Sequence, residues 1–166
     1  MRSDEPDFTE YQAQAIVEYY MKKDGSEYPG YPSIVGGGNN SCVLHYTFNR
    51  KKLNANDVLL VDMGAEYHGY TADITRTIPV NGHFSNEQKL IYQLVYDAQQ
   101  AGFNECKPGN KFRDPHNAAH EVIAKGLKNL GIIKEESDVN TYYTHGTSQY
   151  LRFDLHDAGT SGELKP

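Results

Sequence analysis

The chain has 166 residues, of which 38% are hydrophobic and 23% are charged. This length fits one globular domain, and no apolar run is long enough for a transmembrane helix. The 22 acidic residues outnumber the 16 basic ones and give a net charge of −6, which argues against a general binder of nucleic acid or of anionic membranes. The N-terminal residues lack the apolar segment of a secretory signal, and two cysteines, Cys42 and Cys106, are too few for a disulfide scaffold. We therefore expect a cytoplasmic protein.

Capping signals and hydrophobic periodicity predict three helices. Each begins at a capping residue and continues with apolar positions at helical spacing. We expect them over residues 10–23, from Ser85 to about Gln100, and from Asp114 to a stop at Gly131.

Between and after these helices the pattern is that of strands. Residues 28–46 predict a loop, a short strand, a glycine turn and a strand that ends at His45. Residues 57–66 and 70–78 alternate apolar and polar positions and give the clearest hairpin signal in the chain. The tail, residues 141–157, predicts two short strands around a bend. Because helices and hairpins alternate without a βαβ rhythm, we expect an α+β fold, with an antiparallel sheet and helices on one face.

The predicted hairpin carries two aspartates, Asp62 and Asp73, on one face of the sheet. A turn at residues 67–68 would place them directly opposite each other. A turn at residues 68–69 would place Asp73 opposite Gly64, one diagonal away from Asp62. In both registers the two carboxylates lie within about 5–8 Å of each other.

Two carboxylates at this spacing repel each other, so they need a cation or a raised pKa. Carboxylate oxygens are hard ligands that suit Mn²⁺, Mg²⁺ or Ca²⁺, and a pair of them can bridge two metals. Aspartate is also depleted at strand centres. The sequence therefore favours a metal site over two solvated aspartates or an ion pair with Arg76.

The histidines offer further candidates. His145 and His156 lie in one short segment, and imidazoles near a metal serve as ligands or transfer protons. Their spacing matches no zinc motif. His45 is a lone histidine, which by itself is more often structural than catalytic. The other histidines are interpreted as solvated residues on turns and helix surfaces: His68, His83, His116 and His120.

Three segments together resemble the catalytic domain of Xaa-Pro aminopeptidases and prolidases, the pita-bread metallopeptidases: SIVGGGNNSCVLHY, VDMGAEYHGYTADITRTIPVNGHFS and HGTSQYLRFDLHD. The resemblance implies an α+β pita-bread fold with a curved antiparallel sheet. Residues 1–166 would form most of that domain, without its C-terminal strands and without an N-terminal domain. It also implies removal of an N-terminal residue that precedes proline in a peptide substrate. Without the C-terminal strands the sheet would have an unpaired edge, which favours self-association into a homo-oligomer.

The resemblance assigns roles to particular residues. It implies that Asp62 and Asp73 bind metal, and that His45, His145 and His156 position the substrate and relay protons. In this family the centre holds two divalent ions, commonly manganese.

The sequence departs from the family pattern at the metal centre. Gln149 stands where the family has a histidine ligand, and Arg152 stands where it has a glycine. The family's two glutamate ligands lie on strands beyond Pro166, so only Asp62 and Asp73 of its ligand set remain. An amide oxygen is a poorer ligand than imidazole for most transition metals. We therefore expect weak or absent metal binding and impaired activity.

Two alternatives stay open at this point. The chain could be a non-catalytic fragment or relative that binds a peptide or a protein partner, with Arg152 replacing the metal charge beside the aspartates. It could also belong to a sibling branch of the same fold, such as methionine aminopeptidase or creatinase, although the TADITRT and DLHD segments favour the proline-directed branch.

Overall fold

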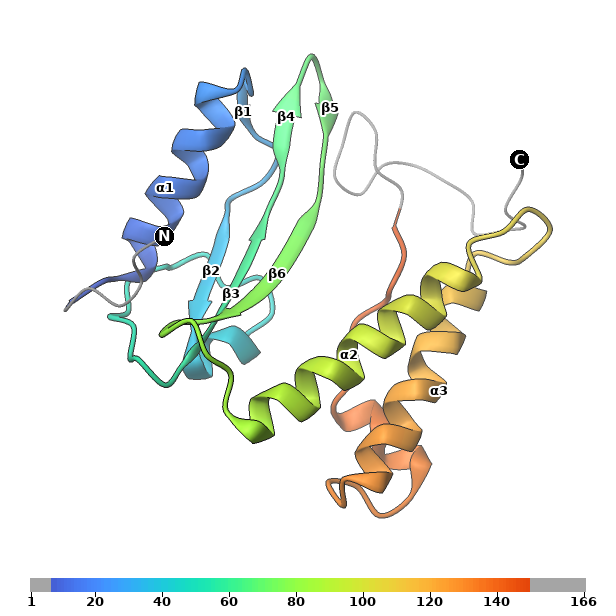
Figure 1. The fold of residues 1–166 in the computed structure, drawn as a ribbon. Coiled ribbons are helices and arrows are strands. Elements are labelled where there is room, and N and C mark those ends of the chain that lie inside the picture. The colour runs from blue at the N-terminus through green and yellow to red at the C-terminus, as the bar shows by residue number, and fades with distance from the viewer. Residues whose placement is uncertain (1–6, 150–166) are drawn as a thin grey trace. The chain divides into compact units, whose positions relative to one another are not determined.

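The computed structural model describes residues 7–149 (Figure 1). This part of the chain forms two compact units, residues 7–85 and residues 86–149. None of its helices is long and apolar enough to cross a membrane.

The first unit begins with helix α1 (Glu10–Lys23), which confirms the predicted bounds. The Thr9 backbone N–H donates a 2.9 Å hydrogen bond to the Gln12 side chain and completes the expected capping box. Within the helix, Ala13 is fully buried and belongs to the core of the unit.

Six strands of the first unit form two antiparallel sheets. The larger sheet has the order β2 (Ile34–Gly37), β3 (Val58–Met63) and β6 (Ile74–Pro79). The smaller sheet has the order β1 (Tyr28–Pro29), β4 (Ala65–Tyr67) and β5 (Tyr70–Thr71). In Figure 1, β3 and β4 succeed each other along one arm of a long hairpin, and β5 and β6 along the other. This hairpin is the predicted one.

The core of the first unit lies between α1 and the larger sheet. Val35 and Leu59 are fully buried there, from the two neighbouring strands β2 and β3. Burying an aliphatic side chain of this size contributes about 1.5–3 kcal/mol. The remaining buried members of the cluster are Phe8, Ala13, Leu53, Val61 and Val80.

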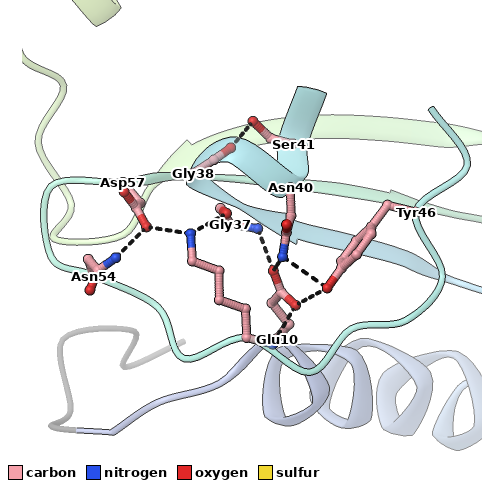
Figure 2. Close-up of polar contacts among 9 residues, drawn as sticks. Glu10, Gly37, Gly38, Asn40, Ser41, Tyr46, Asn54 and Asp57 are labelled. Atoms are coloured by element: carbon pink, nitrogen blue, oxygen red, sulfur yellow. Dashed lines mark hydrogen bonds and ion pairs between the residues drawn. The ribbon is translucent and has the colours of Figure 1, made fainter. Parts of the chain in front are cut away.

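A buried carboxylate ties this unit together (Figure 2). Glu10 has no exposed surface, and its two carboxylate oxygens accept four hydrogen bonds of 2.7–2.9 Å. The donors are the backbone N–H groups of Gly37 and Lys51, the Asn40 amide and the Tyr46 hydroxyl. One side chain of α1 thereby holds the end of β2, the helix η1 (Gly38–Cys42) and the loop that leads to β3.

The same network explains why the strand expected to end at His45 is absent. After η1 the chain turns, and residues 43–48 form no strand. Because Asn40 and Tyr46 both bond to Glu10, this segment folds around a buried carboxylate instead of pairing with the sheet. The prediction of a strand here was wrong.

The second unit contains helices α2 (Asn86–Asn104) and α3 (Asp114–Asn129) and the short helix η2 (Glu136–Thr141). The two long helices pack against each other. Their shared core is a cluster of buried residues that also takes in the segment after α3: Ala98, Ala119, Ile123, Ala124, Leu127, Ile133 and Val139.

Two predicted boundaries in this unit were tested by the structure. The second helix does not end near Gln100 but continues through Gly102, which is buried. A Cβ at Gly102 would lie 3.2 Å from the Pro115 carbonyl oxygen, so the glycine serves the close approach of α3 rather than a helix stop. The third helix ends before Gly131, which has a φ of +70°, as expected. Of the predicted tail strands, residues 142–149 form none, and the rest lies outside the described residues.

The Glu10 network generates a stability prediction. We expect Glu10→Gln to lower the free energy of unfolding by about 2 kcal/mol or more, because the new amide NH₂ faces buried donors that lose their acceptor. Urea denaturation of the full chain measures it. Glu121→Gln is the matched control, since Glu121 is an exposed carboxylate paired with Lys125, and we expect that variant to unfold as the parent does. Equal effects of the two substitutions would contradict the role given to Glu10.

Candidate metal centre

The strand register decides how the two hairpin aspartates lie. Asp62 pairs with Thr75, and Tyr67 pairs with Tyr70, so the turn is at residues 68–69. This is the second of the two registers considered from the sequence. Asp73 falls in the short interruption between β5 and β6, next to the strand that pairs with β3.

A tyrosine brings the two carboxylates together. The Tyr31 hydroxyl lies 2.5 Å from Asp62 Oδ1 and 3.1 Å from Asp73 Oδ1, so both aspartates converge on one donor. All three side chains are half-buried. Burial raises the pKa of Tyr31 far above its usual value, and the hydrogen bond to Asp62 and the two negative charges raise it further. The phenol therefore keeps its proton and donates hydrogen bonds to the two carboxylates.

Gly64 makes this arrangement possible. It lies in the break between β3 and β4, and a Cβ there would be 1.7 Å from the Ala72 carbonyl oxygen and 2.8 Å from the Tyr31 ring. The Gly64 carbonyl also accepts a 2.8 Å hydrogen bond from the Gly30 N–H, which holds the segment that carries Tyr31 against the hairpin. The absence of a side chain at residue 64 thus lets the ring reach the aspartates.

Tyr31 was not among the candidates chosen from the sequence. Tyr31 and Asp62 are 31 residues apart in the sequence, and no local sequence pattern predicts their contact. The signal that could have indicated it is the glycine inside a predicted strand, since such a glycine often marks a close approach by another part of the protein.

The donor set fits a divalent metal in part. Two carboxylates at one point provide hard oxygen ligands of the kind that Mn²⁺, Mg²⁺ and Ca²⁺ prefer. Over residues 7–149, no group of three or more histidine, cysteine, aspartate or glutamate side chains comes close enough to share one ion. The aspartate pair therefore supplies part of a ligand set.

An apolar groove of about 420 Å³ lies elsewhere in the first unit. Residues of α1 and of the hairpin line it, among them Met21, Met63 and Ile74. Neither Asp62 nor Asp73 lines this groove. Because side chains alternate along a strand, Met63 points away from the face that carries its neighbour Asp62.

The histidine candidates lie in different parts of the chain. His45 is exposed in the loop after η1, with a φ of +54°, beside the Tyr46 that bonds to Glu10. His145 belongs to the second unit, where it is exposed and its Nδ1 lies 2.8 Å from the Gly146 carbonyl oxygen. Gln149 also belongs to the second unit and is half-buried. The remaining two positions, His156 and Arg152, lie outside the described residues.

Comparison with curated proteins finds several Xaa-Pro aminopeptidases among the similar proteins. The Xaa-Pro aminopeptidase of Haemophilus influenzae is 37% identical over 99% of this chain and 40% of its own length. The Escherichia coli Xaa-Pro aminopeptidase is 35% identical over 95% of this chain and 37% of its own. Xaa-Pro aminopeptidase 3 of Dictyostelium discoideum is 44% identical over 89% of this chain and 29% of its own length. The chain thus spans 40% or less of the length of these relatives.

Solved structures agree with this similarity. Aminopeptidase PepP of Pseudomonas aeruginosa superimposes with a TM-score of 0.91 at 37% identity, over 97% of this chain and 39% of that one. Escherichia coli aminopeptidase P in complex with substrate gives a TM-score of 0.90 at 34% identity, with the same coverage of 97% and 39%. These matches confirm the expected α+β pita-bread fold.

The family comparison covers almost every residue. The model of metallopeptidase family M24 matches residues 1–165. Together with relatives above 30% identity along nearly the whole chain, this match shows that the chain belongs to metallopeptidase family M24.

Proposed function

We propose that this chain carries the aspartate part of the metal centre of an aminopeptidase that removes an N-terminal residue from peptides with proline in the second position. The convergence of Asp62 and Asp73 on the Tyr31 hydroxyl carries the proposal, because it places two hard ligands at one point. The names of the relatives support the substrate class: several are Xaa-Pro aminopeptidases.

Asp62 and Asp73 would hold the divalent metal, which we propose is Mn²⁺. A zinc-substituted form of Escherichia coli aminopeptidase P is among the similar structures, so the test includes both metals. The chemistry that a metal of this kind supplies is a water made acidic enough to attack a carbonyl carbon near neutral pH. Tyr31 keeps the two carboxylates oriented by donating hydrogen bonds to them.

Proton transfer and substrate positioning fall to the histidines in this proposal. His45, His145 and His156 would take these roles, because imidazole titrates near neutral pH and both donates and accepts protons. In an Xaa-Pro peptide bond the proline nitrogen carries no N–H, and it must gain a proton to leave as a secondary amine, so one of these histidines would supply that proton.

Gln149 leads us to propose a weaker metal centre than the relatives have. The resemblance places a histidine ligand at this position, and an amide oxygen replaces that imidazole with a poorer ligand. Activity would then depend on a high concentration of free metal.

A peptide assay tests the function. We expect the full chain with Mn²⁺ to release the first residue slowly from an Xaa-Pro dipeptide, because proline-directed substrates fit the family, and we expect a chelator to abolish the release. Asp62→Asn serves as the inactive control, and Zn²⁺ replaces Mn²⁺ in a parallel series. Release that survives chelation, or equal release from the matching Xaa-Ala dipeptide, would contradict the proposal. No release at any metal concentration would favour the non-catalytic, peptide-binding alternative.

Tyr31→Phe tests the role of the shared hydroxyl. In the metal-free protein this proton offsets the repulsion between Asp62 and Asp73, whereas a bound cation offsets it in the loaded protein. The substitution should therefore lower the stability of the metal-free chain by about 1.5–3 kcal/mol and enlarge the rise in melting temperature on addition of Mn²⁺. Differential scanning calorimetry measures both effects. Tyr28→Phe, at an exposed tyrosine of β1, is the matched control and should change neither. A smaller Mn²⁺ response in the Tyr31 variant would argue against this role.

Gln149→His tests the proposed weakness of the centre. Restoring an imidazole should raise Mn²⁺ affinity on the order of tenfold, the scale on which groups around a metal alter its binding. Titration calorimetry gives the affinity directly. Gln149→Asn retains an amide without an imidazole and should show no gain. If the histidine variant binds Mn²⁺ no better than the parent, Gln149 does not face the metal centre.

A further inference from the structure

The second unit holds a histidine pair that the proposed reaction does not use. His116 and His120 lie one turn apart on α3, and their ring centroids are 6.1 Å apart. The sequence predicted that both are ordinary solvated residues. The structure shows instead that both are half-buried, that His116 contacts the chain after η2 and that His120 contacts Asn140 within η2, so that prediction was wrong.

Each histidine contacts a different point of residues 140–147, which run from the end of η2 into the chain after it. The His116 ring stacks on Tyr143, with centroids 5.2 Å apart and planes inclined by 13°. Its Nδ1 atom lies 3.0 Å from Thr147 Oγ1. One turn along the helix, His120 Nε2 lies 3.2 Å from Asn140 Oδ1. The two rings therefore meet the segment near its beginning, its middle and its end.

Tyr143 connects this contact to the core of the unit. Its ring packs against the buried cluster around Ile123 and Val139, and its N–H donates a 2.8 Å hydrogen bond to the Val139 carbonyl. Its hydroxyl also hydrogen-bonds with Thr147 Oγ1. Thr147 thus meets both His116 and Tyr143, although Thr147 itself is exposed.

His145 lies midway between these two anchors, two residues after Tyr143 and two before Thr147. Its side chain is exposed. The stacked Tyr143 ring lies on one side of it in sequence, and the hydroxyl contacts of Thr147 lie on the other. We propose that His116 and His120 form a clamp on α3 that fixes the main chain carrying His145, which makes His116 a positioning residue.

The protonation state of His116 agrees with such a contact. Burial lowers the pKa of His116, and the positive charges of Arg113 and of a protonated His120 lower it further. A neutral imidazole can accept a hydrogen bond from the Thr147 hydroxyl at Nδ1, while the Tyr143 hydroxyl donates one to Thr147 Oγ1. The three polar groups then form one continuous chain of hydrogen bonds.

The functional meaning of the clamp rests on the proposed function, because it assumes that His145 handles protons or substrate there. The structural claim, that the clamp orders the segment around His145, does not rest on the proposed function, because this order can be measured without any turnover. The experiment therefore uses the imidazole signals of His145 in the ¹⁵N-labelled full chain, assigned by their loss in His145→Gln.

Two variants remove the same contact from opposite sides. His116→Phe retains a ring that can stack on Tyr143 but lacks Nδ1, and Thr147→Val retains the shape of threonine but lacks the hydroxyl. We expect the His145 signals to shift or broaden in both. The double variant should resemble Thr147→Val, because that substitution already removes the contact with His116 together with the contact with Tyr143. His83→Phe, at an exposed histidine of the first unit, is the matched control and should leave the His145 signals unchanged.

The outcomes separate the clamp from the proposed function. Unchanged His145 signals in Thr147→Val, an exposed substitution that should leave folding intact, would overturn the clamp whatever the peptide assay shows. Shifted signals support it even if no peptide is cleaved. Where turnover is measurable, we expect kcat to fall on the order of tenfold to a hundredfold with KM nearly unchanged, because a small misplacement of a reacting group has costs of this size. A fall in kcat without a change in the His145 signals would contradict the clamp.

Discussion

The buried carboxylate of Glu10 is the interaction on which the first unit depends. A charge without exposed surface is tolerated only when donors replace the water that it has lost, and Glu10 has four of them. They come from β2, from η1 and from the loop before β3, so the arrangement of three segments follows from one side chain. The position of Glu10 in the first turn of α1 adds the favourable dipole of the helix N-terminus. Since β2 pairs with β3, this network also sets the sheet that carries Asp62.

The aspartates of the hairpin follow a different physical principle. The carboxylate of Glu10 accepts hydrogen bonds from four neutral donors, which makes a stable structural contact. Asp62 and Asp73 instead bring two like charges to the proton of one phenol. That arrangement is unfavourable for folding alone and favourable for binding a cation. The break at Gly64 shows that the backbone accommodates it by allowing Tyr31 to approach. The contrast between the two carboxylate environments distinguishes a structural acid from candidate ligands.

Local signals in the sequence predicted the local structure. The capping box at Thr9 predicted the start of α1. The sequence could also have decided between the two hairpin registers, because glycine favours the second central position of a two-residue turn and Gly69 occupies it in the 68–69 turn. In the structure His68 and Gly69 both have positive φ, as such a turn requires. The failures all involve distant contacts. Tyr31, which contacts the aspartates, lies between β1 and β2, far from them in sequence. The bond between Glu10 and Tyr46 holds the segment around His45 in a loop, where a strand was expected. His116 looked solvated because its partners, Tyr143 and Thr147, lie beyond the end of its helix. Periodicity reports which face of an element is buried, and it carries no information on which polar groups meet there.

Both described histidines with a proposed role share one structural solution. His45 and His145 are exposed, and each stands in irregular chain where no ladder of backbone hydrogen bonds fixes it. In each case a neighbour in sequence is bonded to a polar side chain of a helix: Tyr46 to Glu10 of α1, and Thr147 to His116 of α3. A reacting group must be held close to its productive position while its ring remains accessible. Anchoring a residue one or two positions along the chain satisfies both requirements, because it holds the backbone and leaves the exposed imidazole accessible. The polar side chains of α1 and α3 therefore matter for the arrangement of the loops as much as for the stability of the helices.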